Sequence, residues 1–402
     1  MADIYHRPDL ARELAERLLR PGPLDVGLRS GLFLAGQRRT GKTTFLRQDF
    51  IPALENLGAV VVYVDLWTDL TTDPSKLVVD AVRRALHDME SPASGLARRL
   101  HAVRNVNLDV FGVKFEFDVE KVGTAEGATL AEAFSAAVRR SGTDVVLIVD
   151  EVQHALSSET GQRMLFELKA ARDAVNKTPD MPGHFLFVGT GSHRAKVAEL
   201  TARRQQAFDG AVSANYPVLG RDYVAHVLDD IRPHAIAAGK GLPDTEATFQ
   251  AFEQLGHRPE ELIKALRALL IQGPPAEEMN RTLEIIASAL RSAAADLELE
   301  RVAGLGRLAA AIFDKIATAG DSTKGIFTSA AAEQYSTLVG REVKIEEIQP
   351  VVLALQDANL IMRQQHGVYS VADPFVQKAW LERREMEMLG AMPGDRSPDA
   401  RS

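Results

Sequence analysis

Cysteine is absent from this sequence of 402 residues, which excludes disulfide bonds, thiol nucleophiles and cysteine-ligated zinc or iron–sulfur sites. No apolar run reaches the roughly 18 residues that a membrane-spanning helix needs, and the charged N-terminus, MADIYHRPDL, lacks the apolar centre of a signal peptide. Basic charge is not in excess either, since 47 Lys and Arg face 55 Asp and Glu for a net charge of −8. That balance argues against a protein coated in nucleic-acid-binding charge. We therefore expect a cytoplasmic protein that makes no membrane contact.

The composition that remains is typical of a globular protein, with 46% hydrophobic and 25% charged residues. A chain of 402 residues has room for about two or three domains, each with its own core. No internal repeat is evident, so the division has to be read from motifs.

The motif on which the rest depends is a phosphate-binding loop in GLFLAGQRRTGKTTFLR, residues 31–47. Gly36, Gly41, Lys42 and Thr43 satisfy the pattern G-x-x-x-x-G-K-[ST], and the apolar run before it and the helical continuation after it supply the required strand and helix. The glycines let backbone N–H groups curl around a β-phosphate, Lys42 reaches the β- and γ-oxygens, and the Thr43 hydroxyl is a ligand for Mg²⁺. The other loop positions predicted to line the nucleotide are Gln37, Arg38, Arg39, Thr40 and Thr44.

A later apolar strand, 144–149, ends in the carboxylates of Asp150 and Glu151. In phosphate chemistry Asp150 would hold the Mg²⁺ ion opposite Lys42, and Glu151 would polarise the water that attacks the γ-phosphate. The alternative is a strand-terminating turn. Because a phosphate loop precedes the pair, we favour the catalytic interpretation.

Polar residues after the next apolar strand, FLFVGTGS at 185–192, are further candidates. The hydroxyls of Thr190 and Ser192 would sense the γ-phosphate or fix the attacking water, the alternative being a glycine-rich turn. Three arginines later in the chain could stabilise charge on the transferring phosphoryl group: Arg203, Arg204 and Arg258. The alternative for Arg203 and Arg204 is surface arginines near a helix end, and the alternative for Arg258 is a cap and turn.

Strands and helices alternate in the first half of the chain, which predicts an α/β fold with a doubly wound parallel sheet. Helical patterns separate the loop strand from three further apolar runs: 59–65, 144–149 and 185–188. One stretch departs from this order. Residues 105–119 alternate apolar and polar side chains in two halves around a Phe-Gly pair, which predicts a β-hairpin that packs on the domain or offers an edge to a partner.

The rest of the chain is divided by helical patterns and breakers. We predict a nucleotide-binding core at 1–220, a helical lid at 221–300, a winged-helix domain at 301–386 and a disordered tail at 387–402. The winged helix rests on three helical stretches and a short hairpin near 365–369: 303–319, 327–338 and 346–359. The third helix begins KIEEIQP and has little charge to place against phosphates, so we favour protein contact over DNA reading.

The motifs GQRRTGKT (36–43), VVLIVDEVQ (145–153) and FLFVGTGS (185–192) together resemble those of the AAA+/STAND-type P-loop ATPases, in particular compact prokaryotic (archaeal-type) ATPases with a C-terminal winged helix. This resemblance implies a P-loop sheet of the additional-strand class. A glutamate at the position of Glu151 separates ATPases of that class from GTPase-like relatives. The resemblance also implies adenine contacts from Tyr5, His6 and Arg7, and a sensor-2 role for Arg258 at the start of a lid helix.

Three functions follow as hypotheses. The first is a Mg²⁺-dependent ATPase that acts as an AAA+/STAND-like switch, coupling its nucleotide state to a protein partner or to self-association. The second is a nucleotide-regulated DNA-binding protein acting through the winged helix. The third is a nucleotide-binding scaffold that hardly hydrolyses ATP.

Overall fold

The structure is a computed structural model that describes residues 4–69, 71–192, 197–198, 200–201, 206–320, 323–365 and 367–390. It divides into two compact units, Met1–Val218 and Leu219–Ser402, and each unit is described by itself. Among the described residues, no helix combines the length and the apolar character needed to cross a bilayer.

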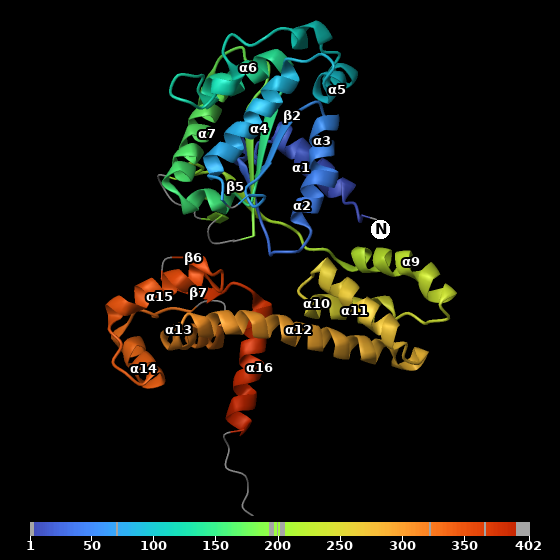
Figure 1. The fold of residues 1–402 in the computed structure, drawn as a ribbon, viewed down its shortest axis with the longest axis vertical. Helices are drawn as coiled ribbons and strands as arrows, with labels where there is room; N and C mark the ends of the chain where they lie inside the picture. Colours follow the sequence, from blue (N-terminus) through green and yellow to red (C-terminus); the bar gives the residue numbers. More distant parts are fainter. Residues whose placement is uncertain are drawn as a thin grey trace, which may run out of the picture. The chain divides into compact units, whose positions relative to one another are not determined.

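The first unit is built on a parallel sheet of five strands (Figure 1). The strands are β1 (Leu32–Ala35), β2 (Val60–Asp65), β3 (Val145–Asp150), β4 (Phe185–Gly191) and β5 (Val212–Asn215), in the spatial order β2-β3-β4-β1-β5. Because β4 lies between β1 and β3, the strand that precedes the phosphate loop does not pair with the strand that ends in Asp150. This is the arrangement of the additional-strand P-loop NTPases, and it confirms the predicted α/β fold.

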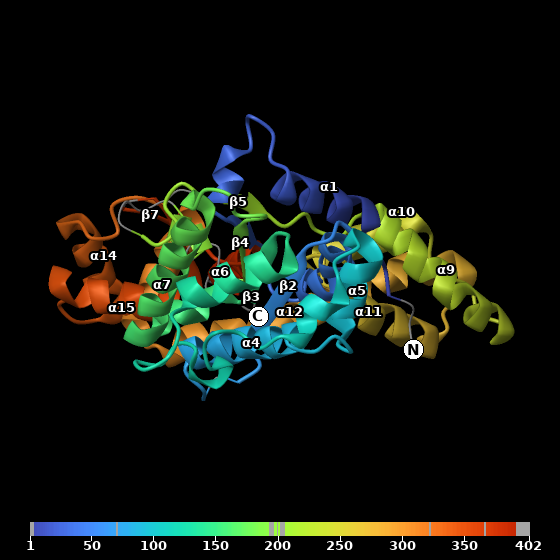
Figure 2. The same ribbon diagram turned by 90° about the horizontal axis from the view of Figure 1, so that it is seen from above.

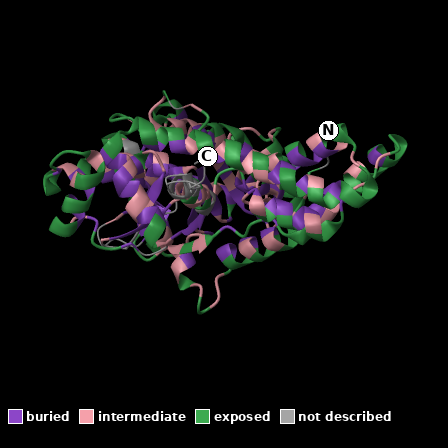
Figure 3. Ribbon diagram, turned by 90° about the horizontal axis from the view of Figure 1, so that it is seen from below, coloured by how far each residue is buried: buried purple, intermediate pink, exposed green. Residues whose placement is uncertain are grey.

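Helices cover both faces of this sheet, as Figure 2 shows with α1 on one side of the strands and α4 on the other. Alternate residues of β3 enter two separate cores: Val145, Leu147 and Val149 join one cluster, whereas Val146 and Ile148 join the other. The helices of the first cluster are α4 (Pro74–Met89), α5 (Gly95–Arg104), α6 (Leu130–Ser141) and α7 (Glu159–Lys177). The second cluster is covered by α1 (Pro8–Leu19), α2 (Lys42–Phe45), a π-helical turn η2 (Leu46–Phe50) and α3 (Ile51–Asn56). Strands β1, β3 and β4 are buried along their whole length, whereas β5 alternates between half-buried and exposed residues. Figure 3 shows buried and exposed residues alternating along the helices.

The predicted β-hairpin at 105–119 is wrong. After α5 the chain forms a 3-10 turn, η3 (Leu108–Gly112), and then an irregular segment without strands. Side chains take the backbone groups that a ladder would use, since Glu90 accepts from the Phe115 N–H at 2.9 Å and Arg140 donates to the Lys114 carbonyl at 3.1 Å. Most of the alternating apolar side chains pack on the first core instead of on a second strand, although Val110 and Val113 are exposed. The rings of Phe115 and Phe117 stack at 5.3 Å.

The second unit is mostly helical. Its elements are α9 (Arg221–Ala237), α10 (Thr245–Gln254), α11 (Pro259–Gln272), η6 (Ala276–Glu278), α12 (Met279–Gly304), α13 (Arg307–Ala319), α14 (Ser329–Val339), α15 (Ile345–Asp357), β6 (Ile361–Gln365), β7 (Val368–Val371) and α16 (Pro374–Gly390). The strands β6 and β7 pair antiparallel, and Thr323 adds an antiparallel bridge to Tyr369.

Three helices followed by a small antiparallel pair is the order predicted for residues 303–371, although the first helix begins later than expected. Gly306, with φ of +97°, separates α12 from α13 where the sequence pattern suggested one continuous helix from 303. A single core joins α13, α14, α15 and the strands. Helix α12 runs through position 300, and the division into a lid and a winged helix stays a prediction.

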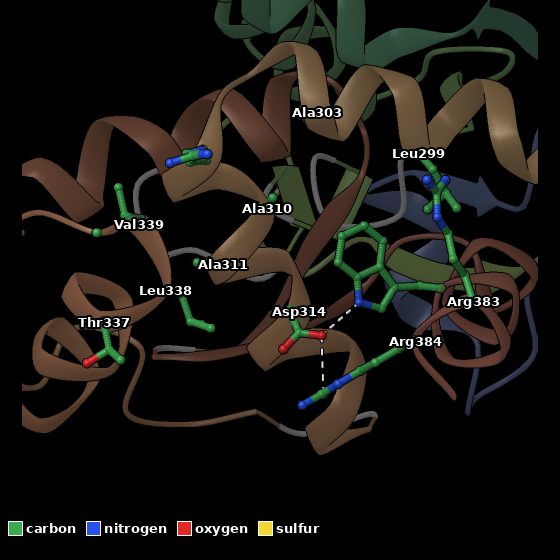
Figure 4. Close-up of a pocket in the computed structure, with 13 residues that line it drawn as sticks. Leu299, Ala303, Ala310, Ala311, Asp314, Thr337, Leu338, Val339, Arg383 and Arg384 are labelled. Atoms are coloured by element: carbon green, nitrogen blue, oxygen red, sulfur yellow. Dashed lines mark hydrogen bonds and ion pairs between the residues drawn. The ribbon is translucent and has the colours of Figure 1, made fainter. Parts of the chain in front are cut away.

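A pocket of about 590 Å³ lies in the second unit between α12, α13, α14 and α16 (Figure 4). On its wall the Asp314 carboxylate accepts from the Trp380 indole N–H at 2.8 Å and pairs with Arg384 at 3.2 Å. The residues predicted from the phosphate-loop and strand-end motifs all belong to the first unit, so this pocket contains none of them.

Candidate nucleotide-binding site

The phosphate loop connects β1 to α2, as its motif predicts. Gly41 precedes α2 in a left-handed conformation, with φ of +88°, which a side chain would strain. Lys42 is buried, and its ammonium group donates to the carbonyl oxygens of Gly36 at 2.8 Å and Gln37 at 2.6 Å. The lysine therefore lies along the inside of the loop, where its ammonium group can exchange these carbonyls for phosphate oxygens as hydrogen-bond acceptors.

The remaining loop side chains divide by exposure. Thr40 is buried and donates to the Gln37 carbonyl at 2.9 Å, so it braces the turn from within. Arg38 and Arg39 are exposed, and Thr44 is exposed on the first turn of the helix. Arg38 nevertheless has two contacts: its guanidinium lies 4.8 Å from the centre of the Trp67 ring, and its Nε donates to the Ser192 hydroxyl at 3.2 Å.

Asp150 ends β3 in a buried position and collects hydroxyl groups from three strands or helices. The Thr43 hydroxyl donates to its Oδ2 at 2.7 Å, the Tyr63 hydroxyl donates to the same oxygen at 3.2 Å, and the Thr190 hydroxyl donates to Oδ1. Burial, followed by the charge of Asp150, raises the pKa of the Tyr63 hydroxyl, so it stays a donor. Thr43 and Asp150 thus lie together, as the motif predicts.

Hydroxyl and carboxylate oxygens of this kind are the ligands that Mg²⁺ prefers, so Thr43 and Asp150 fit the predicted metal. Among the described residues, no group of three His, Asp or Glu side chains could hold a metal ion. A Mg²⁺ ion would consequently need oxygens from the nucleotide or water in addition to these two residues.

Glu151 follows directly in a left-handed conformation, with φ of +55°. One oxygen of its carboxylate, Oε2, accepts from the Ser192 N–H at 3.2 Å, from the Ser192 hydroxyl at 2.8 Å and from the Gln153 side-chain amide. Asp65 ends the neighbouring strand in register with Asp150. Burial raises the pKa of the Asp65 carboxyl, and the charges of Asp150 and Glu151 raise it further.

The N-terminal segment lies against the helix that follows the loop. The π-helical turn η2 carries Asp49, whose buried carboxylate is bound by the His6 ring at 2.7 Å and by the Arg7 backbone N–H at 3.1 Å. The Arg7 guanidinium lies 5.3 Å from the centre of the Tyr216 ring and donates to the Pro217 carbonyl at 2.6 Å. Tyr5 is half-buried in the same segment. Their predicted contact with adenine stays a prediction.

Three predicted residues lie outside the part of the first unit that the structure describes. Arg258 directly precedes α11 in the second unit, where it forms an ion pair with Asp373. Arg203 and Arg204 lie outside the described residues. Their predicted roles in phosphoryl transfer remain predictions.

Sequence reasoning missed four residues that the structure places around the loop: Tyr63, Gln153, Asp49 and Tyr216. Tyr63 had a signal, because it precedes Asp65 by two positions and so shares its side of β2, the strand beside β3. Gln153 stands in the VVLIVDEVQ motif, but nothing in its spacing gave it a role. The other two are defined by tertiary contacts: Tyr216 packs 3.1 Å from where a Cβ on Gly36 would lie, and Asp49 depends on a π-helical turn.

Comparison with known proteins agrees with this architecture. Residues 27–197 match the model of a family described as the AAA domain. The fold is similar to that of a Walker-type ATPase of Pyrococcus abyssi, with a TM-score of 0.52, 18% identity, and 94% of this chain and 96% of that chain covered. It is also similar to the ADP form of the ORC2 protein of Aeropyrum pernix, with a TM-score of 0.54, 13% identity, and 97% and 96% covered. At these identities the likenesses establish the fold alone. No curated protein matches the chain.

Proposed function

We propose that the chain is a Mg²⁺-dependent ATPase that hydrolyses ATP to ADP and phosphate, because residues 27–197 match the AAA domain family and lie on a P-loop NTPase fold. One observation carries the proposal. Hydrogen bonds join four residues at the carboxyl ends of the strands into one group: Thr43 on the phosphate loop, Asp150 at the end of β3, Glu151 directly after it and Ser192 after β4. Lys42 precedes Thr43 and donates to the loop carbonyls. Ligands of open parallel sheets bind at this edge.

The chemistry assigned to each side chain follows from its position. The loop N–H groups and Lys42 would bind the β- and γ-phosphates and reduce repulsion against an incoming nucleophile. Thr43 and Asp150 would hold Mg²⁺, which supplies charge neutralisation of the phosphate oxygens when bound. Glu151 would take a proton from the attacking water as its oxygen bonds to the γ-phosphorus and the bond to the β,γ-bridging oxygen breaks. The products are ADP, phosphate and a protonated Glu151, which then returns its proton to solvent.

We further propose that nucleotide state controls binding of a protein partner or of a second copy of the chain. The appended unit supports this, because it has a core of its own. Protein contact is favoured over DNA because the first turn of α15 carries Glu346 and Glu347, and Glu347 is paired with Arg341. DNA binding at low salt that depends on the nucleotide would reverse this preference.

Hydrolysis is tested by phosphate release from the full chain with ATP and Mg²⁺. Glu151→Gln removes the proton acceptor while keeping the size of the side chain, so we expect the turnover rate to fall about 100-fold or more. Equal rates for the wild type and the variant would refute the catalytic assignment. Lys42→Ala should abolish tight ATP binding in a calorimetric titration, and retained affinity would refute the assignment of the loop.

A further inference from the structure

We propose that Gln153 is a positioning residue for hydrolysis, whose side-chain amide fixes the Glu151 carboxylate so that its second oxygen faces the attacking water. The inference rests on the proposed ATPase function and assigns a role to a residue outside the phosphate-loop and strand-end motifs. Gln153 lies on η5 (Val152–Ser157), directly after the strand that carries Asp150, and it is only 6% exposed.

The amide belongs to a closed group of three residues. Its Nε2 donates to Glu151 Oε2 and also lies 3.3 Å from the Ser192 hydroxyl, and that hydroxyl donates to the same Glu151 oxygen at 2.8 Å. Arg38 adds a donor to the Ser192 hydroxyl from the phosphate loop. The group therefore links three segments of the site: the loop, the end of β3 and the end of β4.

Every hydrogen bond that reaches the Glu151 carboxylate in the described structure goes to one oxygen. Oε2 receives Gln153 Nε2, the Ser192 N–H and the Ser192 hydroxyl, whereas none of the described residues donates to Oε1. A carboxylate held by one oxygen in this way has a fixed orientation, and the other oxygen remains an acceptor for a water proton. Of the side chains that donate to Oε2, that of Gln153 comes from η5, which directly follows Glu151.

The orientation of the amide is decided by its neighbours. The reverse assignment would place its Oε1 against the Glu151 carboxylate, which is unfavourable, so the nitrogen faces Glu151. Oε1 is then buried with no hydrogen-bond partner among the described residues. A Cβ on Gly191 would lie 2.3 Å from this oxygen, so the glycine leaves the space that the amide occupies. A buried acceptor without a partner destabilises a fold, and an apolar side chain of the same size would avoid that cost. The hydrogen bond from Nε2 to Glu151 therefore explains why an amide, and not an apolar side chain, stands at position 153.

The experiment compares the turnover rate, the KM for ATP and the affinity for ATP of full-length variants. Gln153→Leu keeps the volume and removes the donor, so we expect kcat to fall about tenfold through lost orientation of Glu151. The affinity for ATP should stay within about twofold of the wild type, and the thermal midpoint within about 4 °C. Gln162→Leu is the matched control: Gln162 also donates an amide, to the Leu156 carbonyl at 3.1 Å, but has no contact with Glu151, and its kcat should not change.

Gln153→Glu supplies a signature that a packing role would not produce. Two carboxyl groups at hydrogen-bond distance share one proton, and the protonated form of the introduced group can donate to Glu151 as the amide does. We expect low turnover near pH 8 that recovers as the pH falls to about 6, while the wild type shows no such rise. A wild-type kcat for Gln153→Leu, a higher one, or no recovery of Gln153→Glu at low pH would overturn the inference. Equal rates for Glu151→Gln and the wild type would instead overturn the proposed ATPase, so the two failures are distinguishable.

Discussion

Gly189 offers a quantitative test of how β4 is packed beneath the site. It pairs with Phe33 of β1, and a Cβ at this position would lie 2.7 Å and 2.8 Å from two atoms of the Phe33 ring and 3.2 Å from a methyl group of Val152. The ring cannot swing away, because Phe33 is fully buried and contacts the rings of Phe187 at 5.6 Å and Phe208 at 5.2 Å. Gly189→Ala therefore has to displace packed aromatic rings.

The free energy of unfolding should fall by about 1–2 kcal/mol. Overpacking a well-packed core costs about 1–3 kcal/mol, and alanine regains about 0.5–1 kcal/mol because glycine loses more backbone entropy in a strand. For a unit of about 200 residues this corresponds to a fall in the thermal midpoint of about 4 °C.

The assay needs a reporter for the first unit alone, because two units need not unfold together. The chain has two tryptophans, Trp67 in the first unit and Trp380 in the second, so a Trp380→Phe background leaves fluorescence that reports on the first unit. Gly95→Ala is the control: the added Cβ meets nothing within 4 Å at the start of α5, and the change should be neutral or stabilising. If Gly189→Ala were as stable as the wild type, or if its cost persisted in a Phe33→Leu background, the packing argument would be refuted.

Two further predictions concern the carboxylates of the site. Thr43→Val removes a hydroxyl that lies 2.7 Å from Asp150, so the Mg²⁺ concentration for half-maximal turnover should rise about tenfold or more, and an unchanged requirement in a magnesium titration would contradict the metal assignment. Asp65→Asn tests the raised pKa of that carboxyl. Because burial raises the pKa in the folded state above the unfolded value, the unfolded chain loses its proton first, and ionisation costs stability as the pH rises through the carboxyl range. The variant should therefore have a higher thermal midpoint than the wild type at pH 7 and an equal one at about pH 3. A lower midpoint at pH 7 would show that the hydrogen bond from the Trp67 backbone N–H to the Asp65 carboxylate, at 2.8 Å, outweighs the cost of burying the charge.

The fold was predictable where the chemistry is local. An apolar strand, a loop with fixed glycines and a helix have to follow one another for Lys42 and Thr43 to meet a phosphate, so the motif identifies all three. The carboxylates of Asp150 and Glu151 were predictable for the same reason: a buried strand of six residues ending in two acids has few structural explanations. The family resemblance predicted a parallel P-loop sheet, which the structure confirms, but the order of its strands comes from the structure.

The failures have a common physical cause in tertiary contacts. At 105–119 apolar and polar residues do alternate, but no pair of strands forms. Glu90 and Arg140, which are distant in sequence, bind backbone groups of this segment instead. Asp49 stands on the π-helical turn η2 and its carboxylate accepts from the Arg7 N–H, and no residue pattern predicts such a turn. The ion pair of Arg258 with Asp373, 115 residues away, is also a contact that spacing cannot anticipate, and the predicted role of Arg258 stays a prediction.

The contact between Arg7 and the Pro217 carbonyl has a consequence for the covalent connection between the two units. Pro217 is the penultimate residue of the first unit, so the guanidinium at the start of the chain holds the segment from which the second unit departs. The backbone N–H of Arg7 also donates to Asp49, which lies on η2 after the phosphate loop. Substituting Arg7 would therefore act at both ends of the first unit's chain, and Arg7 should be kept in any experiment on communication between the units.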